Sequence, residues 1–210
     1  MIAAFNPGLL VLPLFVILPG LIFWFARNQA RKNLEGLRAF AARAGLRVTE
    51  KTVLGFTVVE SLEGPQQGRP VRYWSYATGS GKSRTNWVAV GVTVPGGALQ
   101  FDLSRQNFAS RVMELFGTRE IQVGDEAFDR AWFVRTNQPE YFAAALVPAI
   151  RAKLMAEIGD RRSTCSFKLE QGIVRYTEMG GLSAAVVERL ATKLPLLLDL
   201  ADVAEVAGGR

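Results

Sequence analysis

An alternating aromatic and β-branched stretch decides the predicted fold: VRYWSYATGSGKSRTNWVAVGVTV, at residues 71–94. The letters GSGKS at its centre look like the end of a phosphate-binding P-loop, which reads G-x-x-x-x-G-K-[ST] and joins a buried strand to a helix. Here the first glycine of that pattern falls on Tyr76, and the residues after Ser83 alternate as in a strand. We therefore predict that GSGKS is the tip of a β-hairpin, and we expect no nucleotide there.

The hairpin prediction also sets a register. A two-residue loop at Ser80 and Gly81, or a four-residue loop at residues 79–82, places the same residues opposite one another. Aromatic and β-branched pairs of this kind contribute about 0.2–1 kcal/mol each. The predicted pairs are Val71 with Val90, Tyr73 with Val88, Trp74 with Trp87, and Tyr76 with Thr85.

Further short runs rich in β-branched and aromatic residues surround this hairpin, separated by Gly and Pro. This spacing is typical of an antiparallel meander. The predicted strands are at residues 53–62, 69–78, 84–94 and 98–103, and a later hairpin is predicted at 163–180.

Helices are predicted mainly in the second half of the chain. A short helix is expected at residues 108–117, and a turn with a strand at 124–136. Another helix begins near Pro139, with a kink or break at Pro148, and the last one is capped by Ser183 and interrupted at Pro195. Strands followed by packing helices predict one α+β domain at residues 46–210.

The N-terminal stretch from residue 2 to residue 26 contains no Asp, Glu, Lys or Arg. The apolar run LLVLPLFVILPGLIFWFA at 9–26 would extend about 27 Å as a helix, close to the ~30 Å hydrocarbon core of a bilayer. A cleaved signal peptide would need a basic start and a small-residue cleavage site, and a buried helix is rarely apolar all round. We expect residues 1–26 to form a transmembrane anchor, with Leu9, Leu14, Leu18, Trp24 and Phe25 as anchoring residues.

A basic segment follows at residues 27–45. Six cations from Arg27 to Arg47 are opposed only by Glu35, and none precedes the apolar run. The positive-inside tendency predicts a single pass with the N-terminus outside and the C-terminal domain cytoplasmic. The segment is expected to be an amphipathic helix that continues the span and ends at Gly45. Its cations would signal topology or contact lipid head groups: Arg27, Arg31, Lys32 and Arg38.

The sequence offers little for catalysis. Histidine is absent, which removes Ser-His-Asp and Cys-His catalysis and His-ligated metals, and the single Cys165 cannot form an internal disulfide. The acidic run GDEAFD at residues 124–129 lacks EF-hand spacing, and we interpret it as a turn with solvated acids around a buried Phe128. We predict no catalytic residue, no metal site and no cofactor.

One aromatic and basic group could face a partner: Arg72, Trp74, Tyr76 and Trp87. Aromatic residues and Arg are favoured at protein interfaces. A second hydrophobic layer beneath a helix is the alternative, and the pattern favours it.

Parts of the sequence resemble membrane-anchored bacterial proteins of unknown function. The resemblance lies in the span-and-stem layout and in GRPV at 68–71, GDEAFDRAWFVRTNQPE at 124–140 and LVP at 146–148. It implies a bacterial origin, and with it the inner (plasma) membrane as the location of the predicted span. It implies no activity and no catalytic residue.

The leading functional hypothesis is a membrane-anchored interaction or accessory protein on the cytoplasmic face, with a subunit of a larger membrane complex as its more specific form. Its predicted partners are membrane lipid and a membrane protein. Nucleic acid is not expected, because most of the net charge of +6 belongs to the basic segment. The alternatives are a small-molecule or lipid-binding module and a histidine-free enzyme that uses Asp102, Glu126 or Asp129.

Overall fold

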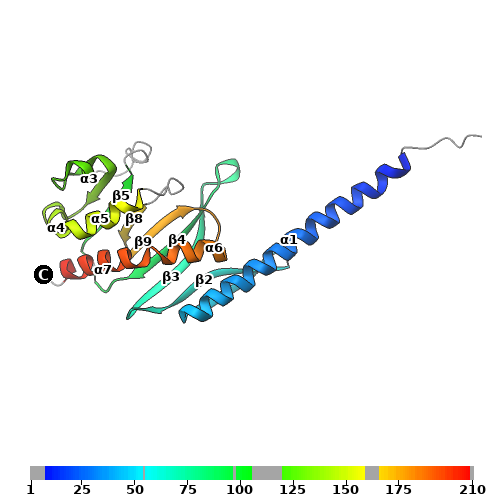
Figure 1. The fold of residues 1–210 in the computed structure, drawn as a ribbon, viewed down its shortest axis with the longest axis horizontal. Coiled ribbons are helices and arrows are strands. Elements are labelled where there is room, and N and C mark those ends of the chain that lie inside the picture. Colours follow the sequence, from blue (N-terminus) through cyan, green and yellow to red (C-terminus); the bar gives the residue numbers. More distant parts are fainter. Residues whose placement is uncertain (1–7, 54, 97, 106–119, 159–165, 209–210) are drawn as a thin grey trace, which may run out of the picture.

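Nine strands form one antiparallel sheet in the described part of the chain (Figure 1). The structure, a computed structural model, describes residues 8–53, 55–96, 98–105, 120–158 and 166–208. The strand order is β1-β2-β3-β4-β9-β8-β5-β7-β6. The strands are β1 (Arg47–Val53), β2 (Phe56–Gln66), β3 (Arg69–Thr78), β4 (Thr85–Thr93), β5 (Phe101–Arg105), β6 (Glu120–Ile121), β7 (Trp132–Thr136), β8 (Ser166–Glu170) and β9 (Ile173–Met179).

Helices precede, interrupt and follow the strands, so the predicted α+β class with an antiparallel sheet is confirmed. The predicted meander holds from β2 to β4 but is wrong for the next strand: β5, expected at 98–103, pairs with β7 and β8, and β9 lies beside β4. The first helix, α1, is also the longest of those described. The helices are α1 (Gly8–Ala44), α3 (Glu126–Ala131), α4 (Pro139–Ala145), α5 (Pro148–Glu157), α6 (Ala184–Ala191) and α7 (Leu194–Gly208), with a 3₁₀ turn η1 (Gly81–Ser83).

The β3–β4 hairpin is confirmed, but its register differs from the predicted one by two residues. Tyr76 lies opposite Trp87 rather than opposite Thr85. The loop is longer than expected because residues 79–84 include η1, in which the amide of Ser83 donates a 3.1 Å hydrogen bond to the carbonyl of Ser80. A shift of two keeps every side chain on its predicted face, since side chains alternate along a strand. The residues after this loop form β4, so GSGKS does not open a helix as a P-loop does.

The predicted hairpin near the C-terminus is confirmed as β8–β9. Gln171 and Gly172 have φ angles of 53° and 73°, and Glu170 pairs with Ile173 on either side of them. Two adjacent residues with positive φ form the tight turn whose twist matches that of the strands.

Prolines and capping side chains set the helix boundaries as predicted. Pro139 and Pro148 each stand in the first turn of a helix, so the break at Pro148 divides α4 from α5. Ser183 caps α6, and its hydroxyl accepts a 3.3 Å hydrogen bond from the amide of Val186. The predicted helix at 108–117, like Cys165, lies outside the described residues.

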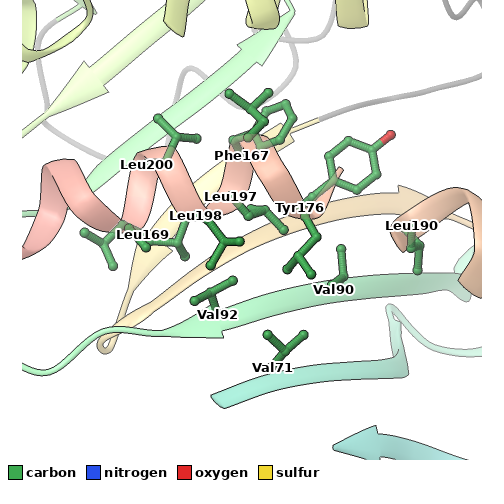
Figure 2. Close-up of a cluster of buried hydrophobic side chains, with 14 of the residues drawn as sticks. Val71, Val90, Val92, Phe167, Leu169, Tyr176, Leu190, Leu197, Leu198 and Leu200 are labelled. Atoms are coloured by element: carbon green, nitrogen blue, oxygen red, sulfur yellow. The ribbon is translucent and has the colours of Figure 1, made fainter. Parts of the chain in front are cut away.

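The hydrophobic core lies between one face of the sheet and the helices. In Figure 2 leucines of α7 lie over valines of β4 and over side chains of β8 and β9. Phe142 of α4 stacks on Phe101 of β5 with ring centres 4.7 Å apart. The labelled members of the cluster are Val71, Val90, Val92, Phe167, Leu169, Tyr176, Leu190, Leu197, Leu198 and Leu200.

Helix α1 is continuous, as predicted for the segment that joins residues 1–26 to the basic stem. Its N-terminal end extends beyond the sheet (Figure 1), the ring of Phe23 lies 5.8 Å from that of Phe56 at the start of β2, and the C-terminal half packs against β1, β2 and α6. Leu37, Phe40 and Ala41 are buried there. The apolar side of the predicted amphipathic helix is thus part of the same core as the strands.

The predicted transmembrane anchor is wrong: none of the described helices is both long enough and apolar enough to cross a membrane. The single-pass topology and the inner-membrane location with the N-terminus outside depended on that span, and they are wrong with it.

The predicted anchoring residues all belong to α1. The side chains of Leu9 and Leu14 lie outside the described part of the chain. Those of Leu18, Trp24 and Phe25 are exposed.

Candidate functional site

The sheet has one face covered by helices and an opposite face, which we call the open face. Alternation along β3 and β4 places Tyr73 and Val90 beneath the helices and Trp74 and Trp87 on the open face. Helices contact the covered face in every described contact that identifies a face of the sheet; these helices are α1, α4, α6 and α7. The predicted aromatic layer beneath a helix is therefore not formed by the described helices.

An aromatic row lies at one end of the open face. Tyr76 and Trp87 are directly opposite each other, and Met179 of β9 lies on the other side of Trp87. The indole Nε1 of Trp87 donates a 2.8 Å hydrogen bond to Oγ1 of Thr78, which fixes the ring orientation. Both rings are half-buried and Met179 is exposed, so apolar surface faces solvent here.

Trp74 is held in place by its neighbours on the open face. A Cβ atom on Gly91 would lie 3.0 Å from Cη2 of Trp74 and 2.8 Å from Cγ2 of Ile173, so glycine leaves the room that the indole occupies over β4. The guanidinium of Arg72 lies 5.6 Å from the Trp74 ring centre and also pairs with Glu63 at 2.9 Å. A fixed indole beside a stacked guanidinium is a preorganised contact surface.

A charged row crosses the sheet beside the aromatic residues. Lys168 and Arg175 are directly opposed like charges, an arrangement that is destabilising unless it is compensated. Glu170 compensates both, because its Oε2 atom lies 3.1 Å from Nζ of Lys168 and 3.1 Å from Nη2 of Arg175. The residues that face one another from strand to strand are Glu63, Arg72, Gly91, Arg175, Lys168, Asp102, Arg135 and Glu120.

A pocket of about 210 Å³ lies between these two rows. Small residues separate the rows, since Ala89 faces Thr177, which in turn faces Ser166. The pocket therefore has an aromatic side, a cationic side and hydroxyl groups within it. Its lining residues are Tyr76, Thr78, Trp87, Ser166, Lys168, Arg175 and Thr177.

Asp102 continues the charged row on the far side of Lys168. Its Oδ2 atom lies 3.6 Å from Nη2 of Arg135, whose side chain is buried. Burial raises the pKa of the Asp102 carboxyl, although Arg135 and Lys168 act in the opposite direction. On the other side of the sheet, the hydrogen bond from Arg69 lowers the pKa of Glu205.

These two carboxyls should give opposite pH dependences of stability. A raised pKa in the folded state gives a contribution that is complete below the usual value of 3.8 and is lost as the pH rises through the folded pKa. A lowered pKa gives a contribution that is complete above the usual value of 4.5 and is lost as the pH falls.

The measurement is urea unfolding between about pH 3 and pH 7 for the wild type, Asp102→Asn and Glu205→Gln. The stability of the wild type relative to Asp102→Asn should decrease with rising pH, and its stability relative to Glu205→Gln should increase. Differences that do not change with pH for either variant would contradict these assignments.

The predicted head-group residues lie on the exposed side of α1. Arg31 pairs with Glu35 at 3.0 Å, and Arg38 pairs with Glu50 of β1 at 2.7 Å. These two cations are thus engaged within the chain. Arg27 and Lys32, also predicted there, are exposed on α1.

The acidic run forms a capped helix rather than the predicted turn. Asp125 caps α3 by accepting a 3.2 Å hydrogen bond from the amide of Phe128, and Asp129 accepts one of 2.9 Å from the amide of Val123. Phe128 is buried, as predicted. Asp102 lies on the open face of the sheet, opposite Arg135, and not on α3. Asp125 and Asp129 instead order the start of α3.

The cationic side of the pocket was not predicted from the sequence. Lys168 and Arg175 lie in a predicted hairpin, and their direct opposition follows from its turn at Gln171 and Gly172. Their position beside Trp87 depends on the pairing of β9 with β4, which are far apart in the chain. No local pattern indicates that pairing.

The fold defines a class: an α+β protein whose antiparallel sheet is covered by helices on one face. No protein-family model matches the chain, and no curated protein matches it. Among solved structures it is similar to the mycobacterial trehalose monomycolate transport factor A, TtfA, with 12% identity and a TM-score of 0.49, over 79% of this chain and 90% of that one. This similarity is weak, and it carries no argument about function.

Proposed function

We propose that this chain is an interaction protein, an accessory subunit that binds a protein partner through the open face of its sheet. The observation that carries the proposal is the gathering of Arg72, Trp74, Tyr76 and Trp87 on a face that no described helix covers. Trp, Tyr and Arg are the residues that most often dominate the energy of protein interfaces.

The size of the pocket favours a protein partner over a free small molecule. Pockets for drug-sized ligands usually measure about 300–1,000 Å³. The pocket beside Trp87 measures about 210 Å³, which is enough for one inserted side chain. The half-buried rings around it would supply the flat remainder of an interface.

A second, larger groove favours the alternative function, the binding of a small ligand. It measures about 860 Å³ and lies among α4, α5 and α7, where Val147 and Val206 are exposed. Its lining is mainly apolar, as small-ligand sites are. It also supplies a control surface for the test of the open face.

The test is quantitative co-purification with the tagged full-length chain as wild type, Trp87→Ala and Val206→Glu. If the open face binds the partner, Trp87→Ala should weaken the complex by about 2 kcal/mol or more, roughly thirtyfold in affinity. Val206→Glu should leave it unchanged. Loss of the partner with Val206→Glu and its retention with Trp87→Ala would place the interface in the groove and refute the proposal.

A further inference from the structure

We infer that the pocket beside Trp87 receives a carboxylate, supplied by an acidic side chain of the partner. The inference rests on the proposed function and adds the chemistry of the group that the partner inserts. Three features of the open face carry it: two convergent cations, a partly exposed glutamate that can be displaced from them, and an aromatic side.

The two cations already converge on one carboxylate within the chain. Nζ of Lys168 and Nη2 of Arg175 both lie 3.1 Å from the same atom, Oε2 of Glu170. Their geometry therefore suits a carboxylate oxygen. Glu170 itself stands at the end of β8 with its side chain partly exposed, so it can be displaced.

The row carries as many acidic as basic residues while Glu170 is counted with it. The basic ones are Arg72, Arg175, Lys168 and Arg135, and the acidic ones are Glu63, Asp102, Glu120 and Glu170. A carboxylate of the partner would therefore take the place of Glu170 on Lys168 and Arg175 rather than add to it. Charge-assisted hydrogen bonds to Lys and Arg are the strong ones.

The other side of the pocket suits the apolar part of the inserted residue. Tyr76 and Trp87 offer half-buried rings, and the hydroxyl groups of Thr177 and Ser166 lie in the same pocket. An aliphatic stem against the rings and a carboxylate on the cations would fill both sides. Glu170 then acts as an internal competitor for the cations.

Competition by Glu170 predicts that removing its charge strengthens the binding of carboxylates. Glu170→Gln removes a negative charge that is not part of the binding group, so carboxylates should bind about fivefold more tightly. Arg175→Gln and Lys168→Gln should each weaken binding by about fivefold or more. Lys51→Gln is the matched control, because Lys51 also pairs with a strand glutamate, Glu60, at 3.2 Å, and it lies on β1.

The experiment is an NMR titration of the ¹⁵N-labelled full-length chain with benzoate, with benzamide and inorganic phosphate as separate arms. Benzoate should give saturable shifts at the indole Nε1–H of Trp87 and the amides of Lys168, Arg175 and Thr177. Benzamide, which has the ring without the charge, should not. Lys51→Gln should behave as the wild type.

Several results would overturn the inference. Equal shifts with benzamide would show that the cations play no part, and binding of phosphate without benzoate would exclude a carboxylate. An unchanged or weaker affinity in Glu170→Gln would refute the competitor. If Trp87→Ala loses the partner while Arg175→Gln keeps it, the proposed function stands and this inference falls. If benzoate binds as described but no partner depends on the open face, the proposed function falls, and of this inference only the carboxylate site remains.

Discussion

Replacing Lys193 by alanine is expected to reduce the free energy of unfolding by about 3–5 kcal/mol, the cost of leaving one member of a buried ion pair uncompensated. Lys193 lies between α6 and α7 and pairs with Glu157 of α5, with side-chain exposures of only 10% and 15%. Its Nζ atom is also 5.9 Å from the ring centre of Tyr176. Urea unfolding of the variant measures the loss.

The control for this prediction is a second ion pair in the same part of the helical layer. Lys153 of α5 pairs with Asp199 of α7, but the side chains are 51% and 31% exposed. Lys153→Ala should therefore cost at most about 1 kcal/mol. The double variant Lys193→Met with Glu157→Gln should recover much of the lost stability, because no buried charge then lacks a partner. Equal losses for Lys193→Ala and Lys153→Ala would show that burial of the pair does not matter.

Phe40→Ala is expected to cost a similar 3–5 kcal/mol, because it empties a filled position in the core. Phe40 is 5% exposed, and its ring meets the edge of Tyr73 with centres 5.6 Å apart. The change would loosen α1 from the sheet. Thermal or urea unfolding measures it.

Phe25 supplies the control on the same helix. It is 65% exposed, so Phe25→Ala should change the stability by less than about 0.5 kcal/mol. A large loss at Phe25, or none at Phe40, would contradict the packing of the C-terminal half of α1 against the sheet.

Local signals predicted the parts of the fold that depend on neighbouring residues. The turn predicted at Gln171 and Gly172 is the β8–β9 turn, where both residues adopt positive φ. Pro139 predicted a helix start because it suits a first turn, and Pro148 predicted the kink or break that divides α4 from α5. The faces of β3 and β4 followed from alternation alone.

The errors arose where the decisive contacts are less visible in the sequence. The β3–β4 register shifted because Ser80 and Ser83 form a turn inside a longer loop. The short helix α3 was missed because its cap, Asp125, reads equally well as a turn residue. β1 was missed because its side chains, as in RVTEKTV, are mostly polar and exposed along one edge of the sheet.

Only the aromatic side of the candidate site could be predicted from the sequence, for the same reason. Trp74, Tyr76 and Trp87 belong to one hairpin, so their grouping was readable locally. Lys168 and Arg175 join them only through the β4–β9 pairing, which the helices above the sheet help to hold. The basic residues with the most visible pattern, those of α1, lie elsewhere.

Hydroxyl-radical footprinting of the full-length chain, alone and in its purified complex, tests the central claim most directly. Oxidation of Tyr76, Trp87 and the 56% exposed Met179 should fall sharply in the complex. Tyr141, which lines the groove among α4, α5 and α7, should be oxidised to the same extent in both samples. Protection of Tyr141 with no change at Trp87 and Met179 would contradict the assignment of the open face as the binding surface.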